Sequence, residues 1–225
     1  GIGGKTGVNH KGFKNMIGTF NQPVQVIIDT KFLKSLSKLE IQCGLMEVIK
    51  HGLISDKSFF VWLEKNLKQI LSLKPQFIER AIKRSIEIKA DVVSKDEKEN
   101  GLRAILNFGH TFGHALETIG NNKLYTHGEA VALGMLAATK LSESISDLDP
   151  KVFDRVYSTI KNTGIKVKLK KKIFPKKLIK LMQSDKKKNN SQLKFILLEK
   201  IGKAKIKSVS NEVSIENAIK NSLFY

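Results

Sequence analysis

The sequence is poor in several features, and each scarcity excludes a class of protein. It has a single cysteine, Cys43, so it has no intramolecular disulfide framework, which fits a reducing cytoplasm. No apolar run reaches the roughly 18 residues that are needed to span a bilayer. The opening residues, GIGGKTGVNHKG, lack the apolar core of a signal peptide. We therefore expect a cytoplasmic protein that has no membrane partner.

Arginine is also scarce, although the chain is strongly basic. The net charge is +19, yet only four of the 40 Lys and Arg residues are arginine. Arginine reads bases and clamps phosphates through two hydrogen bonds, whereas lysine is a solvated point charge. The basic excess is concentrated late in the chain, in residues 166–190. This composition favours a solvated basic surface and an anionic small substrate over nucleic acid, and a basic helical nucleic-acid-binding module is the alternative of a different class.

Apolar periodicity predicts a mainly helical protein. The chain has 225 residues, of which 41% are hydrophobic, and this is enough for one domain with a core. Near-helical spacing of apolar residues begins at about Leu36. The expected helices cover residues 39–55, 56–73, 75–100, 102–120, 128–145 and 150–164. Residues 192–209 alternate as a short hairpin around Ile201 and Gly202, and we expect this hairpin near the C-terminus.

The first 36 residues have a different character. PVQVIIDT, residues 23–30, is rich in β-branched residues and predicts a buried strand. One strand cannot form a sheet by itself. We therefore expect residues 1–36 to be the last strand and loop of an α/β domain whose front is absent from this chain, and residues 37–225 to form a helical domain.

Histidine spacing suggests a metal site. His110 and His114 lie four residues apart, on one face of an expected helix, and this is half of a zinc site by geometry. Packing is the competing interpretation of this pair. His127 begins another helix, where the helix dipole favours the neutral, ligating imidazole. Glu47 lies in an apolar run, where a carboxylate is costly unless it is paired or coordinated. One Glu and two His are a usual catalytic zinc shell.

Several cations could form an anion pocket beside such a metal. Lys50 lies on the same helix face as Glu47, Lys89 follows isoleucines, and Arg103 lies four residues before Asn107. Taken singly, each cation is normally a surface residue with a buried stem. If they converge, they bind carboxylate or phosphate. The segment GGKTGVN is either an exposed turn or a loop that brings Lys5 close to a phosphate.

The motifs GGKTGVNH, MEVIKHGLI, EIKADVV, LNFGHTFGHALE and HGEAVALGM occur in this order over essentially the whole chain. In this they resemble the 3-dehydroquinate synthase family of sugar-phosphate cyclases. The resemblance implies an NAD-binding α/β domain followed by a helical domain with zinc and substrate sites. It also implies a phosphate-eliminating carbon–oxygen lyase of the shikimate pathway, acting on 3-deoxy-D-arabino-heptulosonate 7-phosphate. The implied cofactors are NAD and Zn²⁺, for which Co²⁺ can substitute, and the implied intact protein is a homodimer.

The resemblance also implies roles for individual residues, and it changes the partner of His110. The implied zinc ligands are Glu47, His110 and His127, and His114 is implied to contact the substrate instead of the metal. The implied catalytic residues are His114, Lys50, Lys89, Glu99, Arg103 and Asn107. The implied substrate contacts are Lys5, Asn15, Lys50, Lys89, Arg103, Asn107, His114 and Lys186. The implied NAD contacts are Lys5, Lys14, Phe32, Leu33, Lys34 and Ser35.

The sequence also departs from the family's pattern. The glycine-rich nucleotide-binding region that the family has upstream is absent, so we expect this chain alone to lack cyclase activity. His51 stands where an aromatic residue such as Tyr is common, and Lys11 and Phe13 stand where Pro and a small residue are common. The register of the phosphate-contacting lysine is open among residues 186–188. The nearest alternative is a sibling cyclase, a 2-deoxy-scyllo-inosose or valiolone-type synthase; a metal-dependent alcohol dehydrogenase is a further one.

Overall fold

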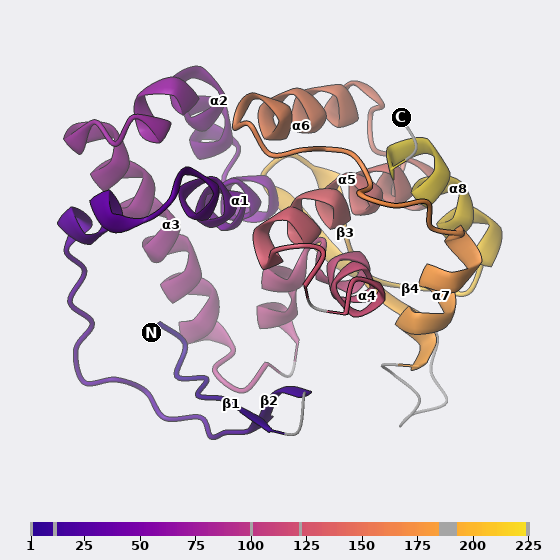
Figure 1. Cartoon of the computed structure of the whole chain (residues 1–225), viewed down its shortest axis with the longest axis horizontal. Coiled ribbons are helices and arrows are strands. Elements are labelled where there is room, and N and C mark those ends of the chain that lie inside the picture. Colours follow the sequence, from indigo (N-terminus) through magenta and orange to yellow (C-terminus); the bar gives the residue numbers. More distant parts are fainter. Residues whose placement is uncertain (1, 11–12, 100, 122, 185–192, 224–225) are drawn as a thin grey trace.

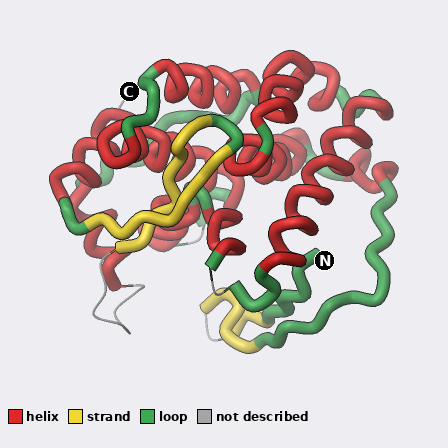
Figure 2. The backbone as a smooth tube through the Cα atoms, turned by 180° about the vertical axis from the view of Figure 1, so that it is seen from behind, coloured by secondary structure: helices red, strands yellow, loops and turns green. Residues whose placement is uncertain are grey.

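The computed structural model describes residues 2–10, 13–99, 101–121, 123–184 and 193–223, and for residues 9, 10 and 13–16 it describes the backbone only. The described part is mainly helical, as expected (Figures 1 and 2). Its helices are α1 (Lys38–Ser55), α2 (Lys57–Leu71), α3 (Pro75–Lys95), α4 (His110–Ile119), α5 (His127–Ser146), α6 (Lys151–Asn162), α7 (Pro175–Ser184) and α8 (Glu212–Leu223). Two 3-10 helices are η1 (Thr30–Ser35) and η2 (Leu102–Asn107).

Helix α5 is the centre of the bundle. It packs against α1, α4, α6 and α8, and strand β3 also contacts it (Figure 1). Its residues 128–139 are buried without interruption because the helix is apolar on every side. The helix predicted over residues 128–145 is confirmed. None of the described helices is long and apolar enough to cross a membrane.

Two antiparallel hairpins flank the helices. Strands β3 (Leu193–Lys200) and β4 (Lys203–Val209) pair Leu193 with Val209 and turn at Ile201 and Gly202, which confirms the predicted C-terminal hairpin. Phe195 of β3 packs against Phe112 of α4, with the ring centroids 5.2 Å apart. Strands β1 (Val8–His10) and β2 (Phe13–Ile17) form the other hairpin, which the sequence analysis did not predict.

The predicted strand at residues 23–30 is wrong. This segment is an extended, exposed stretch with no strand assignment, and Val24 and Ile27 are among its solvent-exposed side chains. It pairs with no other strand among the described residues, and β-branched composition alone cannot make a strand without a partner. The segment then enters η1, whose first turn Asp29 caps by accepting from the N–H of Lys31.

The single helix predicted over residues 102–120 is also wrong. The chain forms η2, leaves the helix at Phe108, and restarts as α4 after Gly109, whose φ of 81° is left-handed. A Cβ on Gly134 of α5 would clash with the carbonyl oxygen of Gly109. The break therefore lets α4 approach α5 closely. Helices α7 and α8 were not predicted from the sequence, and the helix predicted over residues 75–100 ends earlier, at Lys95.

This close approach predicts a change in stability. Gly134→Ala should lower the free energy of unfolding by about 1–3 kcal/mol, because the methyl group must push α5 away from Gly109. Gly44→Ala on helix α1 is the matched control, since a Cβ at this position meets nothing within 4 Å. It should raise the free energy of unfolding by about 0.5–1 kcal/mol. Urea unfolding of both variants checks this, and equal effects would contradict the packing argument.

Candidate active site

Three side chains from three helices converge on one point. Glu47 lies in the middle of α1, His110 is the first residue of α4, and His127 is the first residue of α5. One ligand atom from each lies within 4.8 Å of the others. Oε1 of Glu47 is 3.8 Å from Nε2 of His110 and 3.8 Å from Nε2 of His127. This oxygen is buried and accepts no hydrogen bond in the described part of the chain. An unsatisfied buried carboxylate oxygen is costly, and a cation at this point would satisfy it.

The Nδ1 atom of each of these two histidines lies near a hydrogen-bond acceptor. Nδ1 of His110 lies 3.2 Å from the carbonyl oxygen of Phe108, and Nδ1 of His127 lies 3.5 Å from Oε2 of Glu117. Both acceptors favour a proton on Nδ1, which leaves Nε2 directed toward Glu47. Neutral imidazole in this tautomer is the form that binds a metal ion.

The two imidazoles differ in their proton affinity. Burial, aided by the charge of Lys50, lowers the pKa of His110 to about 3. Glu117 and Glu47 instead raise the pKa of His127 to about 9. Without a metal ion at this point, the two carboxylates outweigh the partial charge at the helix end, which was expected to favour the neutral imidazole. A cation that binds Nε2 must displace this proton.

Glu47 is held ionised. Burial by itself would raise its pKa, but the neighbouring His127 and Lys50 outweigh burial and lower the pKa below its usual range. Its Oε2 accepts a hydrogen bond of 2.6 Å from Nζ of Lys50. Oε2 thus contacts Lys50, whereas Oε1 lies toward the two histidines.

A cleft of about 170 Å³ opens beside this point. The predicted cations, two of the three converging residues and His51 all line this cleft. The full lining is Lys5, Glu47, Lys50, His51, Lys89, Glu99, Arg103, Leu106, Asn107 and His110. Lys50 is only 2% exposed and Arg103 only 4%, so these two are not surface residues with a buried stem. The structure therefore brings six predicted substrate or catalytic residues together. His51, whose Nδ1 lies 2.7 Å from Oγ of Ser85, was noted in the sequence only as a departure.

His114 faces a second, adjoining cleft of about 490 Å³. Lys5, Glu99, Asn107 and His110 line both clefts, so the two spaces share a wall. The ring centroids of His110 and His114 are 5.4 Å apart. The histidine that joins His110 beside Glu47 is His127 rather than His114.

The N-terminal segment closes one side of the clefts. Lys5 forms an ion pair with Glu99, and Asn107 donates a 2.6 Å hydrogen bond to Oε1 of the same carboxylate. Nη2 of Arg103 donates to the carbonyl oxygen of Gly3 at 2.7 Å. Glu99 has a φ of 60°, which is uncommon for a residue other than glycine and is typical of functional sites.

Four of the predicted NAD contacts are not brought to these clefts. Phe32, Leu33, Lys34 and Ser35 belong to η1, which has no buried residue, and they line neither cleft. The side chains of Lys14 and Asn15 lie outside the description, and so does Lys186.

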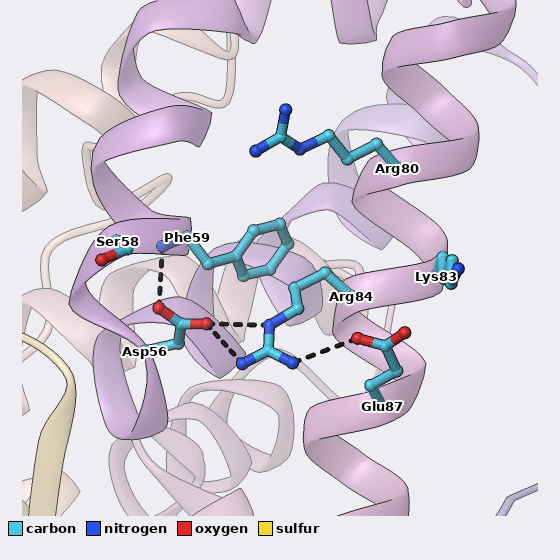
Figure 3. Close-up of a pocket in the computed structure, with 7 residues that line it drawn as sticks. All are labelled: Asp56, Ser58, Phe59, Arg80, Lys83, Arg84 and Glu87. Atoms are coloured by element: carbon cyan, nitrogen blue, oxygen red, sulfur yellow. Dashed lines mark hydrogen bonds and ion pairs between the residues drawn. The ribbon is translucent and has the colours of Figure 1, made fainter.

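Another cleft, of about 400 Å³, lies between α2 and α3 (Figure 3). It contains none of the predicted site residues. Asp56 caps α2 by accepting from the N–H of Phe59 at 2.9 Å, and it also binds Arg84 of α3 at 2.6 Å. Arg84 in turn reaches Glu87, while Arg80 lies over the ring of Trp62. These paired charges join two helices, and we interpret the cleft as structural.

The fold matches a class of solved enzymes. The chain is similar to 2-epi-5-epi-valiolone synthase from Streptomyces hygroscopicus subsp. jinggangensis, solved with NAD⁺ and Zn²⁺ bound, with 26% identity and a TM-score of 0.88. It is also similar to 2-deoxy-scyllo-inosose synthase complexed with carbaglucose-6-phosphate, NAD⁺ and Co²⁺, with 26% identity and a TM-score of 0.82. The matches cover 98% of this chain and 61% and 62% of those chains. The fold is that of the sugar-phosphate cyclases.

The sequence comparisons identify the family within this class. Residues 44–188 match the model of the 3-dehydroquinate synthase C-terminal domain, and residues 1–43 match that of the N-terminal domain. The 3-dehydroquinate synthase of Nitrosomonas europaea is 47% identical over 90% of this chain, and that of Thermoanaerobacter pseudethanolicus is 44% identical over 94%. The chain belongs to the 3-dehydroquinate synthase family. It spans 55% and 59% of the length of these two relatives.

Proposed function

We propose that the protein containing this chain is a 3-dehydroquinate synthase. It would convert 3-deoxy-D-arabino-heptulosonate 7-phosphate to 3-dehydroquinate and phosphate, with NAD and a divalent metal ion. The names of the curated relatives support this reaction. The observation that carries the proposal is the buried, unpartnered Oε1 of Glu47, which lies between two imidazole nitrogens at the edge of a cationic cleft.

The three converging residues fit a divalent metal ion. One carboxylate and two neutral imidazoles suit Zn²⁺ and leave a position open for substrate. We propose Glu47, His110 and His127 as the ligands, with Zn²⁺ as the native ion and Co²⁺ as a substitute. When bound, the ion supplies Lewis-acid polarisation of a substrate oxygen, and NAD supplies reversible hydride transfer.

NAD would contact only part of its site in this chain. We propose contacts at Phe32, Leu33, Lys34 and Ser35 of η1, together with Lys5 and Lys14. The η1 residues form an exposed surface rather than an enclosed cleft, so they fit one side of a dinucleotide. We also propose residues 1–36 as part of the NAD-binding domain, residues 37–225 as the metal and substrate domain, and a homodimer as the assembled protein.

The chain's own residues would bind and orient the substrate. We propose that Lys50, Lys89 and Arg103 hold its anionic groups in the smaller cleft, where burial strengthens each attraction. Asn107 and Glu99 are already joined by a hydrogen bond and would position a hydroxyl group. A ring nitrogen of His114 would take and return a proton in the larger cleft. Lys5, Asn15 and Lys186 complete the proposed substrate contacts.

An activity assay tests this proposal. The purified full-length protein, supplied with Zn²⁺ and NAD, should release phosphate from 3-deoxy-D-arabino-heptulosonate 7-phosphate and form 3-dehydroquinate. Sedoheptulose 7-phosphate is the matched control, because it has a chain of the same length without the carboxylate. Turnover of the control alone would show a sibling cyclase instead. We expect the carboxylate to be required because buried Lys50 and Arg103 both face the smaller cleft.

A further inference from the structure

A buried carboxylate lies behind one of the proposed metal ligands. Glu117 of α4 is 5% exposed, and its Oε2 lies 3.5 Å from Nδ1 of His127. The side chain of His127 is itself 50% exposed. One side of the ring therefore faces solvent, whereas Glu117 lies on the side that is buried within the bundle.

The packing of α4 against α5 determines where this carboxylate lies. Glu117 follows His110 by seven residues, two turns along α4, so both lie on the same face of that helix. A Cβ on Gly113, between them, would lie 3.1 Å from the carbonyl oxygen of Ala130 of α5. The absence of a side chain at Gly113 lets the two helices approach there. This approach brings Glu117 to the beginning of α5, where His127 lies.

We propose that Glu117 is a positioning residue that orients His127 by accepting a hydrogen bond from its Nδ1–H. The role rests on the proposed metal centre. Its effect is to direct Nε2 of His127 toward Oε1 of Glu47, which lies 3.8 Å away. The carbonyl oxygen of Phe108 occupies the equivalent place behind His110. Each imidazole therefore has an acceptor near its Nδ1: a backbone carbonyl for His110, and the side chain of Glu117 for the more exposed His127.

This arrangement explains why the core contains a buried carboxylate. A carboxylate is among the costliest groups to bury, and Glu117 lies on a helix whose other buried side chains are apolar. Partners that orient a metal-binding histidine typically contribute a factor of about 10–100 to metal affinity. A carboxylate that served packing alone would contribute to the free energy of unfolding and not to that affinity.

The experiment measures Zn²⁺ affinity by chelator competition in the full chain and in three variants. Glu117→Leu keeps the side-chain volume and removes the acceptor, so its Kd for Zn²⁺ should rise about 10–100-fold. Glu117→Gln keeps a neutral acceptor and should recover most of this loss. Glu143→Gln removes a carboxylate from the other end of α5 and is the control, with an unchanged Kd. Visible spectra of the Co²⁺-loaded proteins should show altered bands for Glu117→Leu, because the orientation of a ligand has changed.

The outcomes distinguish a failure of the role of Glu117 from a failure of the metal centre. If folded Glu117→Leu binds Zn²⁺ as tightly as the wild type and gives the wild-type Co²⁺ spectrum, the positioning role is overturned and the metal centre stands. If Glu117→Leu does not fold, Glu117→Ala removes the acceptor without filling its space, and a wild-type Kd and Co²⁺ spectrum for Glu117→Ala likewise overturn the role. If the wild type binds no Zn²⁺, the metal centre fails together with the role of Glu117. Unfolding of the metal-free variants in EDTA gives the purely structural part separately.

Discussion

Glu47→Gln is expected to remove bound zinc and nearly all turnover from the full-length protein. Glu47 supplies the one carboxylate of the three converging residues, and its Oε1 has no other partner in the described structure. Gln is nearly the same size and its amide oxygen can still accept the hydrogen bond from Lys50, but it lacks the charge that binds a cation. Lewis-acid stabilisation is worth several kcal/mol, so kcat/KM should fall by about 1,000-fold or more.

Elemental analysis of the purified protein checks the metal, and release of phosphate checks the turnover. Zinc should fall below a tenth of the wild-type content, while the far-ultraviolet circular dichroism spectrum stays the same. Glu143→Gln, which alters a carboxylate paired with Lys140 far along α5, should keep full zinc content and activity. Equal zinc content in Glu47→Gln and the wild type would exclude Glu47 as a ligand.

Lys50→Met should lower kcat/KM by about 100–1,000-fold. The Lys50 side chain is almost fully buried, and its ammonium group contacts Glu47 at the edge of the smaller cleft. Met keeps the length and the apolar stem, so the substitution removes the charge and little packing. A buried charge acts on a bound anion with little screening by water, which is why the loss should be large.

The same variant should also change the pH dependence of zinc binding. Lys50 is one of the charges that hold the pKa of Glu47 down. Without it this pKa rises, so protons compete with zinc at a higher pH, and zinc should be released at a higher pH than from the wild type. Lys83→Met on α3 removes a lysine from the structural cleft and should keep kcat/KM within about twofold of the wild type. Similar activity of Lys50→Met and Lys83→Met would contradict the proposed role of Lys50.

The local sequence pattern was sufficient to predict those elements whose hydrogen bonds join residues close together in the chain. The apolar periodicity of residues 39–55 and 128–145 predicted α1 and α5 within a residue or so, because helix hydrogen bonds join residues four apart. The strand predicted at residues 23–30 failed because strands need partners that the pattern does not contain. The break at Gly109 could not be predicted either, because it depends on contact with Gly134, which is distant in sequence.

The sequence by itself determined the helical character, the C-terminal hairpin and the chemical types available to a site. It contained the carboxylate in an apolar run, the closely spaced histidines and the cations near them. The spacing of the histidines alone left the partner of His110 open, the resemblance implied His127, and the tertiary structure brings His127 to His110 beside Glu47. Only the tertiary structure decided that Glu117 lies behind His127. The physical reason is that spacing within one helix fixes which residues share a face. The packing of α1, α4 and α5 around their glycines fixes which faces meet.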